Sequence, residues 1–377
     1  MADSARSATE AETRVRGQSR PGQDVPGIDV AAVAAWMRSL GQPVDGALRL
    51  TRIGLGQSNL TYLAEDRGGR RWVLRRPPLG HLLASAHDVG REARIIRALE
   101  HTDVPVPVIH GVAGPDTIVG GAPVADAPLV LMEYVDGLAV DRMSVAEGLT
   151  QERRRAIGLS MPAVLARIHA VDLDQAGLAD LAGRKPYAAR QLKRWASQWE
   201  QSKTRELPAF DALTRRLIAA APEQTEVTLV HGDFHLRNVL VAGTPDGGGP
   251  RACGEVVAAL DWELSTLGEP LADIGSMLAY WPEAGEDFGG DFTATALEGS
   301  PTREEVAAEY LRLTGRDESA LRYWHVLGLW KVASIAEGVM RRALDEPRNK
   351  AAAGTPTPER IDALVDKATE LADQAGI

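Results

Sequence analysis

The chain has 377 residues, 44% hydrophobic and 25% charged, enough for a sizeable core and for two lobes rather than one compact unit. Its formal net charge of -10 argues against sequence-independent nucleic-acid binding, which needs clustered positive charge. The single cysteine, Cys253, excludes an intrachain disulfide and, with no signal peptide in the sequence, favours the cytoplasm; no apolar run approaches the roughly 20 residues that span a bilayer.

The N-terminal part of the chain is expected to be rich in strands. Residues 1–26 are polar and nearly devoid of large apolar side chains, so we expect a disordered segment there. Residues 27–136 are predicted to form an N-terminal lobe that opens with a helix, capped by Asp29 and ended by Gly41. Its other predicted elements are strands at 48–53, 59–65, 71–75 and 129–135, a helix at 88–100, and an extended, proline-containing segment at 104–108.

Residues 137–377 are predicted to form a larger, mostly helical C-terminal lobe. Helical periodicity predicts helices at 153–170, 187–203, 210–221, 271–280, 303–313, 321–344 and 358–375. The exception is a strand–turn–strand unit at 228–260, whose turn is rich in glycine and proline. With a hinge expected near 132–137, the fold class is α+β with two lobes.

The strand–turn–strand unit carries the residues with the clearest chemistry. The sequence His231-Gly-Asp233-Phe-His-Leu-Arg-Asn238 has the Asp-x4-Asn spacing of a kinase catalytic loop, and Asp261, at the end of an apolar run, stands where a kinase holds its metal. We predict Asp233 as the catalytic base or hydroxyl-orienting group, and Asn238 and Asp261 as ligands of Mg2+, which prefers oxygen donors. A turn or strand-ending Asp explains each residue alone, but the spacing of all three indicates a phosphotransferase.

Two nearby residues are expected to have structural roles. Asp273 lies at the start of a predicted helix, where its carboxylate can accept backbone N–H bonds from the catalytic loop. His231 is expected to order that loop rather than to act as a base.

A glycine-containing loop lies between the first two predicted strands. It reads Gly54-Leu-Gly56-Gln-Ser58-Asn59, and glycines let backbone N–H groups approach a phosphate closely. We interpret this loop as a cover over nucleotide phosphates. It lacks the third glycine of Gly-x-Gly-x-x-Gly, and an ordinary hairpin is the simpler alternative.

Further nucleotide contacts are expected from the next strand and helix. Arg75 and Glu92 occupy the strand and helix positions of a kinase Lys–Glu pair, and Arg keeps the charge while adding a fork suited to phosphate. Arg76 could serve instead, and a surface ion pair of little energetic value is the alternative. Glu133 and Val135 are expected to line an adenine pocket through their backbones, although the same residues fit a plain buried strand.

Two stretches of opposite charge are candidates for the acceptor site. The basic helix 185–199 could hold an anionic part of the acceptor, or it could be a solvated face with its aromatic residues packed inward. The stretch 281–300 has five carboxylates and no Lys or Arg, which would suit a cationic acceptor or a solvated loop.

Together these residues resemble the aminoglycoside phosphotransferase family, small-molecule kinases with a protein-kinase-like fold, over about residues 30–345. Within that family the chain is most similar to the kinase-like domains fused to acyl-CoA dehydrogenases and to their free-standing bacterial relatives. The segments that carry this likeness are 73–78, 189–195, 260–273 and 328–338. The resemblance implies ATP- and Mg2+-dependent phosphorylation of a hydroxyl on a small molecule, and for the subgroup a hydroxyacyl-CoA. It also makes an acceptor-binding role for the basic helix as well supported as the solvated-face reading.

Three functions remain open from the sequence. The first is a metabolic kinase acting on a hydroxyacyl-CoA-type compound, and the second is an aminoglycoside or macrolide antibiotic kinase, which the acidic stretch would suit. The third is a catalytically silent nucleotide-binding module, which Arg in the usual Lys position leaves open. Because no glycine follows the aromatic residue in Asp261-Trp-Glu, a flipping activation segment is not expected.

Overall fold

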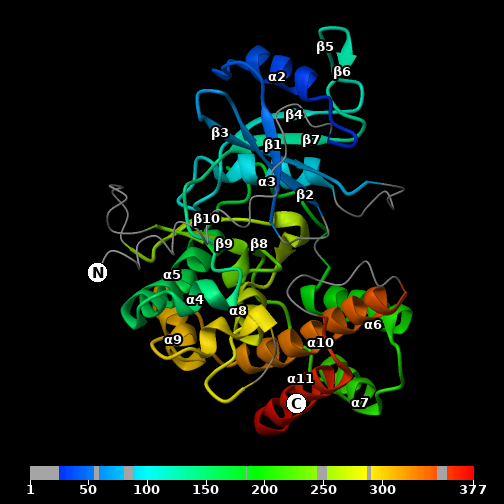
Figure 1. Cartoon of the computed structure of the whole chain (residues 1–377). Helices are drawn as coiled ribbons and strands as arrows, with labels where there is room; N and C mark the ends of the chain where they lie inside the picture. Colours follow the sequence, from blue (N-terminus) through cyan, green and yellow to red (C-terminus); the bar gives the residue numbers. More distant parts are fainter. Residues whose placement is uncertain are drawn as a thin grey trace. The chain divides into compact units, whose positions relative to one another are not determined.

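The computed structural model describes residues 25–54, 59–79, 88–183, 185–243, 253–286, 290–345 and 355–377. The chain divides into two compact units: unit 1 comprises Met1–Arg94 and Pro107–Tyr134, and unit 2 comprises Ile95–Val106 and Val135–Ile377. Among the described residues, unit 1 is rich in strands and unit 2 is mostly helical, as Figure 1 shows. The α+β fold class predicted from the sequence is confirmed.

Unit 1 is built on one antiparallel sheet of strand order β1-β2-β3-β7-β4. Its strands are β1 (Arg49–Ile53), β2 (Leu60–Glu65), β3 (Arg71–Arg76), β4 (Ile109–Ala113) and β7 (Leu129–Glu133), and a small hairpin pairs β5 (Ile118–Val119) with β6 (Ala122–Pro123). Its helices are α2 (Val30–Ser39) and α3 (Val89–Leu99), the latter continuing into unit 2. The strand β4 was not predicted; the extended segment expected at 104–108 ends just before it, because Pro105 and Pro107 lack the N–H groups a ladder needs.

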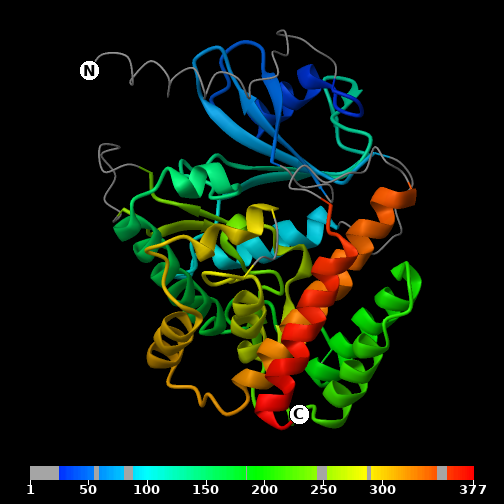
Figure 2. The same ribbon diagram turned by 60° about the horizontal axis from the view of Figure 1, so that its bottom comes forward.

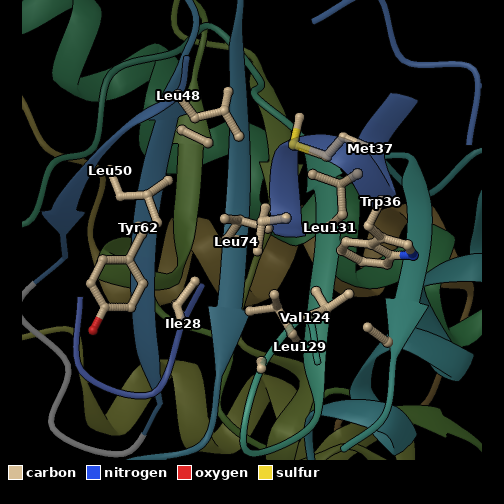
Figure 3. Close-up of a cluster of buried hydrophobic side chains, with 14 of the residues drawn as sticks. Ile28, Trp36, Met37, Leu48, Leu50, Tyr62, Leu74, Val124, Leu129 and Leu131 are labelled. Carbon is tan, nitrogen blue, oxygen red and sulfur yellow. The ribbon is translucent and has the colours of Figure 1, made fainter. Parts of the chain in front are cut away.

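The core of unit 1 lies between the sheet and α2. Side chains alternate along β2 and β3, so that Tyr62 and Leu74 are buried while their neighbours are more exposed. Trp36 and Met37 of α2 pack onto this buried face beside Leu131 of β7 (Figure 3). As expected, Asp29 caps α2: its Oδ1 accepts the N–H of Ala32 at 2.9 Å.

Unit 2 consists mainly of helices whose ends agree within two residues with those predicted from periodicity. They are α5 (Gln151–His169), α6 (Tyr187–Ser202), α7 (Pro208–Ala219), α8 (Pro270–Ala279), α9 (Arg303–Thr314), α10 (Leu321–Asp345) and α11 (Pro358–Ala375). The short α4 (Met143–Glu147) and the 3-10 segments η1 (Leu236–Asn238), η3 (Trp262–Leu264) and η4 (Gly290–Ala296) were not predicted. Across the part of the chain that the structure describes, no helix is long and apolar enough to cross a membrane.

The long helix α10 organises unit 2. It packs against α8, α11, α6 and α7, and Figures 1 and 2 show α11 running alongside it. Phe210 of α7 stacks between Trp199 of α6 and Trp330 of α10, with ring centroids 3.8 and 5.3 Å away. Trp199, one of the aromatic residues of the basic helix 185–199 that could pack inward, is thus part of the core.

Two short antiparallel pairs in unit 2 carry the predicted catalytic residues. The strand β9 (Val239–Val241) pairs with β10 (Val256–Ala259), and β8 (Thr228–Val230) pairs with β11 (Thr266–Gly268). The sequence indicated the first pair but not β11. Both pairs end at the loops that hold His231–Asn238 and Asp261.

Candidate active site

The loop after β8 is held in place by one buried carboxylate. Asp273, in the first turn of α8, accepts the N–H of His231 on Oδ2 at 2.6 Å and the N–H of Gly232 on Oδ1 at 2.8 Å. His169 of α5 contacts the same carboxylate at 3.2 Å. Burial alone would raise the pKa of Asp273, but the His169 hydrogen bond and charge, with His231 and the Gly232 N–H, lower it below its ordinary value. The predicted structural role of Asp273 is confirmed.

The glycine of the His-Gly-Asp motif is required by the backbone. Gly232 has φ of +83°, and an added Cβ would lie 2.6 Å from the carbonyl oxygen of Leu264. His231 is fully buried, and its Nε2 contacts the carbonyl of Leu260 at 3.0 Å. Burial lowers the pKa of His231, and the contacts of this buried ring order the loop, as expected.

Asp233 and Asn238 are in direct contact. The side-chain Nδ2 of Asn238 donates to the Asp233 carbonyl at 2.9 Å and to Asp233 Oδ2 at 3.2 Å. Since its nitrogen faces Asp233, the amide presents its oxygen Oδ1 away from that carboxylate, in the form a cation can use.

Asp261 is brought to the same place by the pairing of β9 with β10. The N–H of Leu260 donates to the carbonyl of Asn238 at 2.8 Å, so Asp261 emerges one residue beyond that link. Asp261 has φ of 65° and is alone among the described non-glycine residues in having a positive φ. Left-handed backbone is costly for most side chains and tends to be kept at functional positions.

An Asn and an Asp at adjacent strand ends fit the predicted Mg2+ site. Mg2+ takes one or two protein oxygen ligands and completes its shell with phosphate oxygens and waters. Over the described ranges, no group of three or more His, Cys, Asp and Glu side chains is arranged to hold a metal. The pair Asn238 and Asp261 offers one amide oxygen and one carboxylate, donor atoms that suit this ion.

Positive charge surrounds the Asp233 carboxylate. Burial would raise the pKa of Asp233, but the charge and hydrogen bond of His235, 3.6 Å away, and the charges of Lys331 and His231 together hold it well below its usual range. Asp233 is thus ionised at neutral pH, as an acceptor of a hydroxyl proton must be. Tyr280 packs against His235 with ring centroids 4.6 Å apart and ring planes tilted by 58°.

Three residues of this site were not singled out from the sequence: His235, Tyr280 and Lys331. His235 lies inside the catalytic motif, where only the Asp and Asn positions were assigned. Lys331 was detectable as a single charge within an apolar helical run, Gly328-Leu-Trp-Lys-Val-Ala-Ser-Ile-Ala. Nothing in the local pattern of Tyr280 marks it.

In unit 1, the predicted strand–helix ion pair is present. Arg75 Nε of β3 lies 2.8 Å from Glu92 Oε2 of α3, and both side chains are largely buried, at 15% and 4% exposed. A second nitrogen of Arg75 donates to Thr61 Oγ1 at 3.3 Å. A pair this buried is more than a surface ion pair.

Arg76, the alternative phosphate-binding residue, instead binds groups near the start of unit 1. It is 1% exposed; its guanidinium donates to the carbonyls of Pro26 and Gly27, at 3.2 and 2.8 Å, and pairs with Asp126 at 2.8 Å. Arg76 therefore ties the start of unit 1 to its sheet, and Arg75 is the better candidate for phosphate.

The remaining predicted nucleotide contacts are partly described. Gly54 has φ of +80°, which favours glycine, and Asn59 is buried at the start of the next strand. Gly56 and Ser58 lie outside the described residues. The N–H of Glu133 already donates to the carbonyl of Val108 at 2.8 Å, and Val135 is the first residue of unit 2 after β7.

The two charged stretches differ in how their charges are paired. On α6 and just before it, Lys185, Lys193 and Arg194 are exposed and form no ion pair with any carboxylate of the described residues. In the acidic stretch, by contrast, Arg303 pairs with both Glu283 and Glu286. Part of the negative charge expected to suit a cationic acceptor is thus neutralised within unit 2.

The strand-rich and helical units belong to a small-molecule phosphotransferase with a protein-kinase-like fold. Residues 49–324 match the family model described as phosphotransferase enzyme family, which is most of the chain. The chain belongs to that family.

Individual relatives agree with this. Mouse acyl-CoA dehydrogenase family member 10 is 35% identical over 360 residues, covering 94% of this chain and 32% of the mouse protein, so the chain spans about a third of that relative. A solved structure from Ralstonia eutropha JMP134, described as a candidate aminoglycoside phosphotransferase, has a TM-score of 0.68 and 28% identity over 92% of this chain and 97% of that one. A thermostable mutant of aminoglycoside phosphotransferase APH(4)-Ia, solved with AMP-PNP and hygromycin B, shares the fold, with a TM-score of 0.55 and 15% identity over 88% and 95% of the two chains.

Proposed function

We propose that this protein transfers the γ-phosphate of ATP, in the presence of Mg2+, to a hydroxyl of a small molecule, and that the acceptor is a hydroxyacyl-CoA-type metabolite. The observation that carries the reaction is the contact of Asp233 with Asn238, beside Asp261, on a loop fixed by Asp273. An ionised carboxylate next to an amide–carboxylate oxygen pair is the donor set that phosphoryl transfer needs.

In the proposed reaction Asp233 orients the acceptor hydroxyl and receives its proton late in the transfer. The hydroxyl oxygen forms a bond to the γ-phosphorus as the bond to the bridging oxygen breaks, and ADP leaves. Asn238 and Asp261 would hold Mg2+, which supplies charge neutralisation at the phosphates when bound. No protein nucleophile is required, since positioning and charge neutralisation carry most of the catalysis.

We assign nucleotide contacts to unit 1 by residue type. Arg75, fixed by Glu92, would neutralise phosphate charge, and the loop from Gly54 to Asn59, including Gly56 and Ser58, would cover the phosphates. Glu133 and Val135 would contact the adenine through their backbones. AMP-PNP bound to the APH(4)-Ia mutant supports an adenine nucleotide as donor.

The choice of a CoA ester rests on charge. Lys185, Lys193 and Arg194 give the α6 region exposed positive charge without carboxylate partners among the described residues, which suits the phosphates of a CoA group. An aminoglycoside is cationic and would be repelled there, while the acidic stretch that could attract it is partly neutralised by Arg303. The name of the mouse relative also refers to acyl-CoA chemistry.

The test is ADP release with ATP and Mg2+, comparing 4-hydroxyacyl-CoA, 3-hydroxyacyl-CoA, the matching free hydroxy acids and an aminoglycoside. We expect turnover on a hydroxyacyl-CoA that falls at least about 100-fold in Asp233→Ala. Lys193→Ala with Arg194→Ala should raise KM for the CoA ester and leave turnover of the free acid unchanged. Turnover on the aminoglycoside alone would show that the protein is an antibiotic kinase. Nucleotide binding without turnover on any acceptor would favour a catalytically silent nucleotide-binding module.

A further inference from the structure

Lys331, in the middle of α10, is a buried cation that the proposed reaction leaves without a role. Its residue is 5% exposed, and its Nζ donates to the carbonyl oxygen of Gly232 at 2.5 Å. The same nitrogen lies 5.5 Å from the centre of the Trp195 ring of α6. Lys331 therefore reaches the backbone of the catalytic loop immediately before Asp233.

The position of the Lys331 side chain depends on a close crossing of α8 and α10. An added Cβ on Gly328 would lie 2.7 Å from the carbonyl oxygen of Gly275, and one on Gly275 would lie 2.5 Å from the Trp324 carbonyl carbon. Glycine at both positions lets α10 lie directly on α8. Lys331 follows Gly328 by three residues and so lies on the same face of α10, toward α8 and its Asp273.

An ammonium in this position is costly unless its surroundings compensate the charge. Burial lowers the pKa of Lys331, and Arg194 of α6 adds to that effect, whereas Asp233 and Asp273 act in the opposite direction and favour the charged form. The charged groups that act on Lys331 are thus two carboxylates, from the loop and from α8, and one guanidinium, from α6.

Gly232 is consequently held at both of its backbone polar groups. Its N–H is bound by Asp273 of α8 and its carbonyl by Lys331 of α10. The direction of Asp233 follows from the orientation of the Gly232–Asp233 peptide, whose carbonyl Lys331 holds. A buried cation within reach of Asp233 also offsets the negative charge that gathers there with Asp273.

We propose that Lys331 is a positioning residue for phosphoryl transfer: by binding the Gly232 carbonyl it fixes the direction of the Asp233 carboxylate. The proposal rests on the proposed function of Asp233. It does not require Lys331 to touch either substrate, so its removal should slow the reaction without weakening the binding of nucleotide or acceptor.

Lys331→Met, which keeps the volume of the side chain but removes its charge and donor, is the test. We expect kcat to fall about 10- to 100-fold, as a small misplacement of a catalytic group does, with KM for ATP and acceptor within about twofold of wild type. The melting temperature should stay close to that of wild type. Lys203→Met is the matched control, because Lys203 pairs with Glu200 and Glu206 at the surface and should leave kcat unchanged.

Chemical rescue separates positioning from a purely structural role. In Lys331→Ala, propylammonium replaces the atoms removed, and we expect it to restore kcat in a saturable way, whereas tetramethylammonium at equal ionic strength should not. Wild-type kcat in Lys331→Met would overturn the proposal. So would a loss of kcat that follows a loss of folded protein and that propylammonium does not reverse. Asp233→Ala is assayed in parallel: if it keeps its turnover, the proposed function of Asp233 fails, whatever Lys331 does.

Discussion

Two adjacent arginines in β3 show that the surroundings of a residue determine its role. Arg75 contacts the carboxylate of Glu92 and the hydroxyl of Thr61, and keeps 15% of its side chain exposed. Arg76 is buried and binds the carbonyls of Pro26 and Gly27 as well as Asp126. In sequence they are equivalent, since an alternating strand does not reveal which face carries a ligand.

This contrast predicts different losses for Arg75→Ala and Arg76→Ala. Arg75→Ala should weaken binding of Mg2+–ATP by about 10-fold or more, because a charged hydrogen bond to phosphate is worth about 1.5–3 kcal/mol. Arg76→Ala should leave that affinity within about twofold but lower the free energy of unfolding by about 1–3 kcal/mol, because it removes a buried side chain together with its hydrogen bonds and ion pair. Nucleotide titration and denaturant unfolding of both variants measure the two effects. The reverse pattern of affinities would assign the phosphate role to Arg76.

For single residues, the sequence predicted those that belong to a motif whose spacing the reaction requires, such as Asp233 and Asn238. The contact of Asn238 with Asp233 follows from a local motif, and that of Asp273 with the Gly232 N–H from a helix start, so both could be anticipated. Lys331 is 98 residues beyond Asp233 in the numbering and meets the loop only through tertiary packing, which no local pattern encodes.

Among the elements, α8 and α10 cross at close range. Backbone atoms of the two helices meet at Gly275 and Gly328, and this spacing brings Asp273 and Lys331 to the N–H and the carbonyl of one residue, Gly232. Helical periodicity predicted both helices, within one residue at each end. It could not predict the crossing, because a glycine in a helix indicates close approach without naming the partner.

Gly328→Ala is expected to force the two helices apart. The new Cβ would lie 2.7 Å from a backbone oxygen, so we expect a loss of about 1–3 kcal/mol of unfolding free energy, together with a fall in kcat as the Gly232 peptide shifts. Gly338→Ala in the same helix is the matched control. Its Cβ would meet side-chain atoms no closer than 3.6 Å, so helix propensity should make it about 0.5–1 kcal/mol more stable. Equal effects of the two substitutions in denaturant unfolding would contradict the packing argument.

For the whole molecule, composition and periodicity predicted a strand-rich part followed by a helical part, and the structure has both. The exchange of Ile95–Val106 into unit 2 was not predicted. One helix, α3, belongs to both units, and periodicity within a helix carries no information about where a compact unit ends. In the same way, the fold does not identify the acceptor, because enzymes with one fold act on many different substrates.

Metal-linked stability tests the site in the whole chain without knowledge of the acceptor. A ligand that binds only the folded state raises the unfolding free energy by about 2.7 kcal/mol at 100 times its Kd. We therefore expect ATP with Mg2+ to raise the melting temperature, and EDTA to remove most of that increase.

Asp261→Asn is designed to remove the proposed metal ligand while keeping the backbone conformation. Asn accepts a left-handed conformation about as readily as Asp, so the positive φ at this position should persist and the ligand-free melting temperature should stay near that of wild type. The Mg2+-dependent part of the increase should be lost, because a neutral amide replaces the carboxylate proposed to hold the ion. An unchanged Mg2+-dependent increase would show that Asp261 does not bind the metal, and its strained backbone would then need another explanation.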